Sequence, residues 1–196
     1  MRQFVVLGHE APTDPDFALD DLAGGAGRID VLCRCVNAAF LLSHGIREDV
    51  ELFLILQDRL TLRLVGSELR YLAPEERNIA SLLRSGIEAG QETVGMIEVE
   101  STPGIHASRR GFEAALEDLD GTVIQLHEDG EPIAGTEPPA NPAFVLSDHE
   151  EFADAEADLL DARADARVSL GPEALHANQA ITVAHNVLDT GGYRTY

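Results

Sequence analysis

The 196-residue sequence contains no lysine and no tryptophan. Its 14 basic residues are therefore all arginines, and they face 35 aspartates and glutamates, for a formal net charge of −21. A chain this acidic would ordinarily be argued away from nucleic acid. The acidic residues are, however, spread along the chain over a regular apolar pattern. We interpret this as adaptation to a high-salt cytoplasm, where the Debye length is about 3 Å and self-repulsion is screened. The net charge therefore excludes no class of partner by itself.

Long hydrophobic runs are also missing. No apolar run approaches the length of a membrane span, and the N-terminus MRQFVVLGHE lacks the charged-then-apolar layout of a signal peptide. We therefore expect a cytoplasmic protein without a membrane partner. Hydrophobic residues make up 44% of the chain, which is enough for a sizeable core and argues against disorder. The length fits a single domain over residues 1–196.

Cysteine is scarce, and its placement argues against a redox or metal role. Cys33 and Cys35 fall in VLCRCVN, which is expected to be helical. Residues two apart on a helix point to different faces, so we expect buried, inert thiols and not a disulfide or a metal pair. Asp148, His149 and Glu150 are consecutive in a loop and lack further ligands at suitable spacing. The sequence therefore predicts no metal site.

The apolar pattern predicts an α/β fold with a mainly parallel sheet, because strand-like and helix-like segments alternate. Strands are expected at 3–9 and 50–57, in GTVIQLHEDG and NPAFVLSDHEEF, and just before Gly171. Helices are expected at 29–45, at 73–90, with Arg109 and Arg110 near the start of the next one, and from Pro172 onward. TLRLVG and ELRYL are expected to form a hairpin about Gly66–Ser67, and residues 128–142 a loop.

Three strand ends carry polar or turn-forming residues: VIQLHEDG, FVLSDHE and RVSLGPEALH. Ligands of open parallel sheets bind at the carboxyl ends of strands. The usual fingerprints G-x-G-x-x-G, G-x-x-x-x-G-K-[ST] and G-x-S-x-G do not occur in the sequence. The strand ends therefore predict either three ordinary loops or a site that presents backbone atoms to a ligand.

Five segments, in this order, resemble the archaeal tRNA (pseudouridine-N1)-methyltransferases of the SPOUT superfamily: GRIDVLCRCVNAAFLLSHGIREDVELFLIL, APEERNIASLL, TPGIHASRRGFEAAL, FVLSDHEEF and VSLGPEALHANQAITVAHNVLD. The resemblance spans nearly the whole chain. It implies a SPOUT-type α/β domain whose C-terminal part, about residues 121–190, is tied in a deep trefoil knot. It further implies a homodimer that binds S-adenosyl-L-methionine (SAM) in the knotted loops. The implied reaction methylates N1 of a pseudouridine in the T-loop of tRNA, at the position that the family name gives as 54.

The resemblance, carried over position by position, implies eight cofactor contacts: Leu126, Ser147, Val168, Ser169, Leu170, Gly171, Leu175 and Ala180. Gly171 would let the backbone approach the adenosyl group closely. Pro172 would fit the first turn of a helix, where its missing N–H costs nothing. Two positions depart from the family pattern, since Gly is expected at Ser147 and Cys is common at Ala180. Small residues there keep room for a ligand that is contacted through the backbone.

The implied chemistry needs orientation and little else, because the sulfonium already activates the methyl group. The N1 proton must leave as the methyl arrives, so an acidic side chain could serve as a base. Asp30 in GRIDVLCR is the first candidate for this catalytic role, and Asp148 is the second. The reaction requires no metal.

RNA binding is expected to fall to arginines held on ordered elements. The candidates are Arg28, Arg34, Arg47, Arg109 and Arg110, of which the last two are the one adjacent basic pair in the sequence. Arginine offers bidentate phosphate contacts and stacks on bases. An arginine pair on a helix can equally be a solvated face with local ion pairing.

Two alternatives share the implied fold. One is the related ribosome-biogenesis class, which methylates N1 of pseudouridine in small-subunit ribosomal RNA, although GRIDVLCRC and SHGIRED favour the tRNA branch. The other is a knotted RNA-binding factor that keeps the cofactor pocket without turnover.

Overall fold

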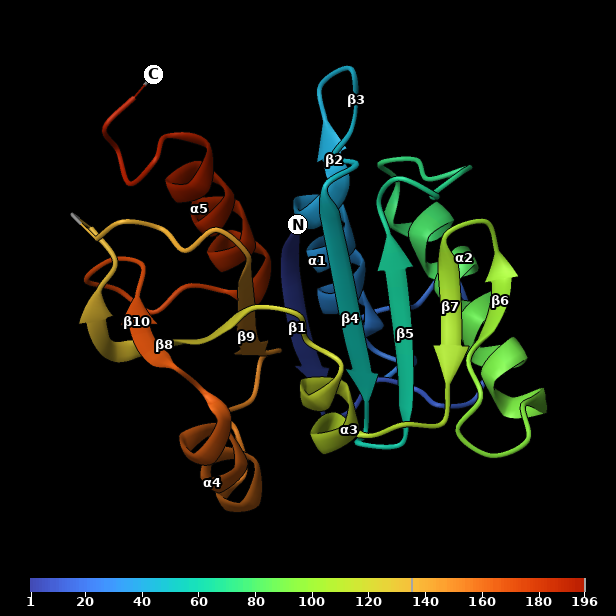
Figure 1. Cartoon of the computed structure of the whole chain (residues 1–196). Helices are drawn as coiled ribbons and strands as arrows, with labels where there is room; N and C mark the ends of the chain where they lie inside the picture. The colour runs from blue at the N-terminus through green and yellow to red at the C-terminus, as the bar shows by residue number, and fades with distance from the viewer. Residues whose placement is uncertain (135, 196) are drawn as a thin grey trace.

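The computed structural model describes residues 1–134 and 136–195, which form an eight-stranded open sheet with helices on both faces (Figure 1). The strand order is β10-β8-β9-β1-β4-β5-β7-β6. These strands are β1 (Arg2–Gly8), β4 (Val50–Leu56), β5 (Leu60–Val65), β6 (Val99–Thr102), β7 (Ile105–Ser108), β8 (Thr122–Pro132), β9 (Pro142–Ser147) and β10 (Ala166–Ser169). A separate ribbon pairs β2 (Leu41–Leu42) with β3 (Gly45–Ile46). The helices are α1 (Ile29–Phe40), α2 (Glu76–Glu92), α3 (Phe112–Glu117), α4 (Asp154–Arg163) and α5 (Ala177–Asp189).

The sheet is parallel over one part and antiparallel over the other. β1 lies in the parallel part, between β9 and β4, and β8 and β10 continue that part outward from β9. β5, β7 and β6 follow β4 in antiparallel order. The carboxyl ends of β1, β4 and β9 therefore meet at one edge of the sheet (Figure 1). The α/β fold with a mainly parallel sheet, expected from the sequence, is confirmed.

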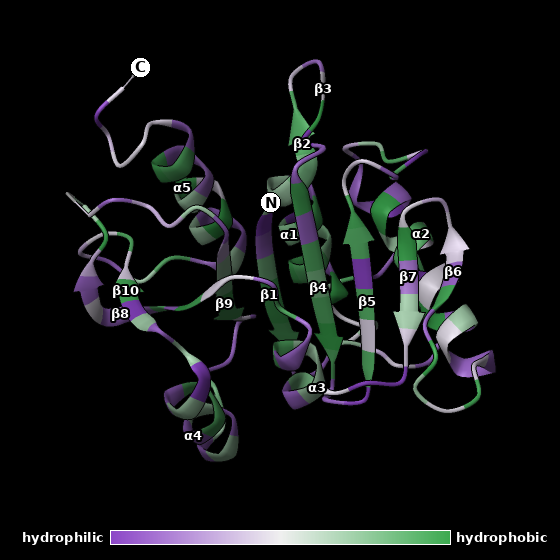
Figure 2. Ribbon diagram, in the orientation of Figure 1, coloured by the Kyte–Doolittle hydropathy of each residue, from purple (hydrophilic) through white to green (hydrophobic). Residues whose placement is uncertain are grey.

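Both faces of the sheet are covered, and successive residues of β1 serve opposite faces. Phe4 and Val6 belong to the larger core, with the buried residues of α1, α2 and α5. Val5 and Leu7 belong to the smaller core, with the buried residues of α3 and α4. Figure 2 shows that the central strands are mostly hydrophobic, as burial on both faces requires.

His185 of α5 is buried in the larger core, near the amino end of β1. Its side chain meets the ring of Phe4 edge-on, with 4.9 Å between the ring centroids. Nε2 donates a hydrogen bond to the carbonyl oxygen of Ala39 at 3.0 Å, and Nδ1 accepts one from the guanidinium of Arg2 at 3.1 Å. Burial, then the positive charges of Arg47 and Arg2, lowers the pKa of His185 to about 4. His185 is therefore neutral at physiological pH.

The hairpin expected about Gly66–Ser67 is wrong. The chain turns instead at Gln57 and Asp58, which have φ of 50° and 53° and join β4 to β5. Residues 68–72 form no strand. Gly66 is needed for a close approach and not for a hairpin, since a Cβ built there would lie 2.2 Å from the carbonyl oxygen of Arg47. The sequence pattern showed a break here but not its cause.

Two helix boundaries also differ from the expectation. Helix α1 ends at Phe40, and the short β2–β3 ribbon occupies the residues up to Ile46, where the helix was expected to continue to Gly45. Helix α5 begins at Ala177, so Pro172 does not lie in its first turn. The Gln179 side chain accepts a hydrogen bond at 3.1 Å from the backbone N–H of His176, the N-cap residue. This capping contact starts the helix five residues after the proline.

Three further elements and the length of a fourth were not expected. Strands β6 and β7 precede Arg109–Arg110, helix α4 lies in the acidic stretch before β10, and β8 extends to Pro132 through part of the expected 128–142 loop. Each is short or rich in charged residues, so its apolar period is weak. Helix α2 runs over 76–92, where a helix at 73–90 was expected, and the main strands lie where they were expected.

The described helices include none that is long and apolar enough to cross a membrane. Cys33 and Cys35 are both buried. Burial raises the pKa of the Cys33 thiol to about 12 and that of Cys35 further still. The expected burial of both thiols is confirmed, and their low reactivity stays a prediction.

Candidate functional site

A cavity of about 210 Å³ opens at the carboxyl end of β9, beside the middle of β8 and the segment that follows β10. Three chain segments far apart in sequence form its wall, and they are the three strand ends singled out in the sequence. The apolar part of the lining consists of Leu126, Leu146, Phe152, Leu170, Leu175 and three alanines, Ala174, Ala177 and Ala180. An apolar wall with polar groups at its rim is the usual form of a small-molecule site.

Six of the eight predicted cofactor residues line this cavity: Leu126, Ser147, Leu170, Gly171, Leu175 and Ala180. The other two, Val168 and Ser169, lie on β10 outside the lining. The carbonyl oxygen of Ser169 accepts a hydrogen bond from the backbone N–H of Ile133 at 3.0 Å, and Gly130 packs against the backbone of Val168. Val168 and Ser169 therefore pair with β8 and the residue after it and do not face the cavity.

The segment 171–176 forms neither helix nor strand, and all of its residues except Pro172 line the cavity. A Cβ built on Gly171 would meet no atom within 4 Å, so any side chain there would project into open space. Leu175 keeps 40% of its surface exposed, which is unusual for a leucine in a wall with buried Leu126 and Leu146. An apolar ligand ring beside Leu175 would cover this surface. The segment thus fits a ligand that needs close backbone approach and apolar contact.

Ser147 replaces the glycine expected in the family, and its hydroxyl has a structural use. The hydroxyl donates a hydrogen bond to the carbonyl oxygen of Glu150 within the same loop. The Asp148 carboxylate also turns this loop, because it accepts a hydrogen bond from the backbone N–H of Glu150 at 3.0 Å. A ligand at this position would meet the backbone of Ser147 and not a free hydroxyl.

The charge of the lining favours a cationic ligand. Its charged residues include five acids and no arginine: Glu128, Asp148, Glu150, Glu151 and Glu173. The sulfonium and ammonium groups of SAM are positive, whereas the phosphates of an ordinary nucleotide would meet like charge. The lining therefore fits SAM in both its apolar and its charged part.

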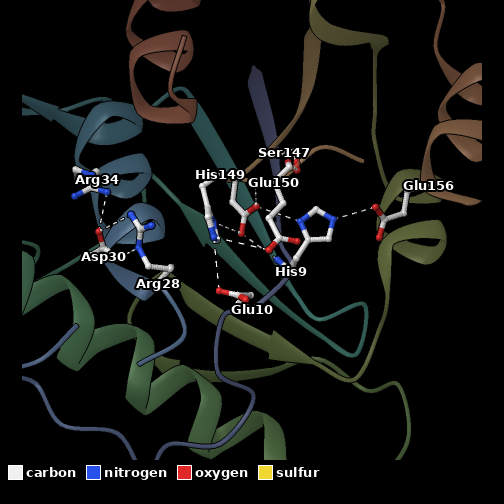
Figure 3. Close-up of polar contacts among 10 residues, drawn as sticks. His9, Glu10, Arg28, Asp30, Arg34, Ser147, His149, Glu150 and Glu156 are labelled. Atoms are coloured by element: carbon white, nitrogen blue, oxygen red, sulfur yellow. Dashed lines mark hydrogen bonds and ion pairs between the residues drawn. The ribbon is translucent and has the colours of Figure 1, made fainter. Parts of the chain in front are cut away.

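His9 joins the end of β1 to this wall (Figure 3). Its Nδ1 lies 3.1 Å from a carboxylate oxygen of Asp148, and its Nε2 lies 3.0 Å from a carboxylate oxygen of Glu156 on α4. Its backbone N–H donates to the other oxygen of Asp148 at 3.0 Å. The Asp148 side chain is 3% exposed, so these contacts are shielded from water.

Asp30 lies in the first turn of α1 between two of the predicted RNA-binding arginines (Figure 3). Arg28 donates from Nε to Asp30 at 3.0 Å, and the Arg34 guanidinium lies 2.7 Å from the other carboxylate oxygen. Burial raises the pKa of Asp30, but the hydrogen bonds and charges of the two arginines outweigh it, and the net pKa lies below its usual value. Arg28 has a φ of 59°, which is rare for a residue with a side chain. The surrounding structure must therefore hold the backbone of Arg28 in this conformation. Asp30 does not line the cavity.

The remaining predicted arginines lie elsewhere. Arg47 lies just before the amino end of β4 and pairs with Asp189 at 2.6 Å, and neither residue lines the cavity. Arg109 donates to the carbonyl oxygens of Gly90 and Gln91 at the end of α2. Arg110 pairs with an aspartate of the α3 region, Asp118. The five arginines thus do not form one patch within a single protomer.

Sequence reasoning missed several lining residues that follow the same strands: His127, Glu128, Leu146, His149, Glu150, Glu151, Phe152, Glu173, Ala174, His176 and Ala177. The strand-end rule could have found them, since eight lie within the three quoted segments and the other three follow directly after them. His9 had no such signal, because both its partners lie about 140 residues away in sequence.

Comparisons with known proteins agree with this geometry. Residues 1–193 match the family model described as "Putative SAM-dependent RNA methyltransferase". A protein of Haloferax volcanii named tRNA (pseudouridine(54)-N(1))-methyltransferase is 61% identical over 198 residues, with 100% of both chains covered. Proteins with the same name from Halobacterium salinarum and Methanocella arvoryzae are 58% and 43% identical, over 100% and 94% of this chain and 100% and 97% of theirs.

Among solved structures, that of Archaeoglobus fulgidus Nep1 bound to S-adenosylhomocysteine superposes with a TM-score of 0.63 at 16% identity, covering 98% of this chain and 97% of that chain. This likeness supports the SPOUT fold expected from the sequence. The pocket, the full-length family match and the high identity to the named relatives agree, and the chain belongs to this family of SAM-dependent RNA methyltransferases.

Proposed function

We propose that this chain transfers the methyl group of SAM to N1 of pseudouridine 54 in tRNA. The observation that carries the proposal is the wall of the cavity, which six predicted cofactor residues line at the carboxyl edge of the sheet. The full-length relatives at 61% identity are named for this reaction. The family model and the S-adenosylhomocysteine-bound neighbour support the cofactor.

The chain's own residues orient the reactants. SAM, when bound, supplies a methyl group on a positive sulfur, which becomes neutral once the methyl has left. Leu126, Leu170 and Leu175 would cover the apolar part of the cofactor, and Gly171 would admit it to the backbone. The N1–H bond of pseudouridine breaks as the N1–CH₃ bond forms, so one proton is released per turnover. Correct alignment of N1 with the methyl carbon supplies most of the acceleration in this scheme.

Neither candidate base is free to take that proton. Asp30 is held by Arg28 and Arg34, and a carboxylate whose pKa is lowered is a weaker base. Asp148 lies at the cavity, but hydrogen bonds from His9 and from the backbone of Glu150 occupy its oxygens. Asp30 stays a candidate base, but its surroundings favour a positioning role. In this role its carboxylate fixes the guanidinium groups of Arg28 and Arg34, two of the arginines expected to bind RNA.

Arginine contacts and RNA shape carry the recognition of tRNA in this proposal. Counterion release gives little affinity at molar salt, because binding constants fall linearly with salt on logarithmic scales. Salt screens the long-range attraction between arginines and phosphates more than it screens direct stacking and bidentate contacts, such as those expected from Arg28 and Arg34. An affinity for tRNA that collapsed between low salt and molar KCl would contradict this part of the proposal.

The working assembly we propose is a cytoplasmic homodimer with the C-terminal knot that the family resemblance implies. Relatives from Haloferax volcanii and Halobacterium salinarum and the net charge of −21 support a high-salt habitat. Sedimentation in molar KCl measures the mass of the assembly, and a monomer at micromolar concentration would contradict the dimer.

Mass spectrometry of tRNA nucleosides from a strain lacking the gene tests the function, with the parent strain beside it. The expected result is loss of N1-methylpseudouridine from the T-loop, with pseudouridine in its place, and restoration by the wild-type gene. Complementation with Gly171→Val, which fills the cavity, should fail. Unchanged tRNA together with a methyl group missing from ribosomal RNA would assign the enzyme to the other substrate. Unchanged tRNA and ribosomal RNA would contradict methyl transfer altogether.

A further inference from the structure

His9 stands between two carboxylates that belong to different parts of the fold. Asp148 follows β9 in the cavity wall, and Glu156 lies in the first turn of α4. The ring nitrogens lie 3.1 and 3.0 Å from these two groups, and the His9 side chain is 17% exposed. The loop 148–153 includes five of the lining residues. His9 contacts the first residue of this loop, Asp148, and Glu156 in the helix that follows the loop.

Both ring nitrogens of His9 face an acceptor. An ionised carboxylate can only accept hydrogen bonds, so both contacts are satisfied together only when both nitrogens carry a proton. Burial lowers the pKa of His9, but the hydrogen bonds and charges of Glu156 and Asp148 outweigh it, and the net pKa lies above the ordinary value of 6.5. The doubly protonated ring is therefore the form that fits this position.

We propose that His9 is a positioning residue for the cofactor: its two-sided contact with Asp148 and Glu156 holds the loop 148–153 in the shape that forms the cavity wall. This inference rests on the proposed function, because it takes the cavity to be the cofactor site. His9 itself does not line the cavity. It acts through Asp148, which does line the cavity.

The pH dependence of this device has a definite sign. The contact is complete below about pH 6.5, the ordinary pKa of histidine, and is lost as the pH rises through the raised pKa of His9. Other charged groups stand around it: His149 lies 3.3 Å from Asp148, Glu10 and Glu150 lie near His149, and the charge of Arg28 reaches Asp148. Loss of a proton from the His9 ring leaves one nitrogen without a donor, so one of the two carboxylate contacts is lost.

Calorimetric titration with S-adenosylhomocysteine at molar KCl, from about pH 6 to about pH 9, tests the proposal. The wild type should bind more weakly as the pH rises. His9→Gln can reach one carboxylate but not both, so at about pH 6 it should bind about tenfold more weakly than the wild type, with a flatter pH profile. His9→Arg, which keeps the charge and offers several donors, should recover part of the affinity. His106→Gln is the matched control, because His106 makes a similar 3.2 Å contact with Glu68 far from the cavity.

Equal affinities of wild type and His9→Gln at every pH would overturn the proposal. Hydrogen exchange of residues 148–156, compared between these two proteins at one pH, separates this inference from the proposed function. Faster exchange confined to this segment in His9→Gln supports the positioning role, even if neither protein binds the cofactor and the proposed function fails. Unchanged exchange would refute the positioning role whatever the cofactor does.

Discussion

Mild acid should destabilise this protein through one buried side chain, His185. The imidazole is 3% exposed, and its two nitrogens are committed in opposite senses. Nε2 donates to the carbonyl oxygen of Ala39, whereas Nδ1 accepts from Arg2. A second proton on the ring would remove the acceptor and place a positive charge against the guanidinium of Arg2.

The size of the effect follows from the pKa. The folded-state value of about 4 lies below the ordinary value of 6.5, so the unfolded chain binds the proton more readily between these two pH values. The contribution of His185 to the free energy of unfolding is therefore fully present above about pH 6.5 and is lost as the pH drops toward 4. Since each pH unit is worth about 1.4 kcal/mol, the loss by pH 4 is about 3 kcal/mol.

Urea unfolding at fixed molar KCl, from about pH 4 to about pH 7, measures this loss against His185→Gln. Glutamine keeps one donor and one acceptor but does not titrate.

The variant is expected to be less stable than the wild type at neutral pH, because glutamine packs less well against Phe4. The difference should shrink by about 3 kcal/mol on acidification, as only the wild type carries the protonation penalty. Many carboxylates titrate in both proteins, so only the difference is diagnostic. Parallel pH profiles would refute the reasoning.

Three further predictions test other parts of the site. Gly171→Val should leave the free energy of unfolding within about 0.5 kcal/mol and weaken S-adenosylhomocysteine binding at least tenfold by calorimetry, whereas Gly45→Ala, also at an open position, should change neither. Asp30→Asn removes the charge that holds two arginines, so tRNA affinity by filter binding should fall more than cofactor affinity, and wild-type values for both would contradict the positioning role. Cys33 and Cys35 should resist thiol reagents until the protein unfolds, and rapid labelling of the native state would contradict their burial.

The apolar period of the sequence predicts the central strands and long helices because those segments are buried on one or both faces. It fails where burial is slight. Helix α4 has one fully buried residue, Leu160, and β6 has none, so neither leaves a usable period. The start of α5 was placed at Pro172 because proline favours a first helical turn, but the capping contact between His176 and Gln179 sets the start.

The candidate site divides in the same way. Residues at strand ends, such as Ser147 and Leu170, follow from topology and family resemblance, and the structure brings them to one cavity. The pairing of His9 with Asp148 and Glu156 depends on how β1 and β9 meet, which a local pattern does not encode. The positive φ of Arg28, next to the buried Asp30, likewise has no signal in the local pattern.

The central position of β1 has a consequence for how the protein is made. β1 is synthesised well before one of its two neighbours, β9, which ends only at Ser147. Until that strand leaves the ribosome, the nascent chain carries an unpaired, strongly apolar strand edge, which is prone to aggregate. Closing such a long loop late also slows folding. We therefore expect the first 140 residues to need chaperone protection, and completion of the cofactor wall to be among the last steps of folding.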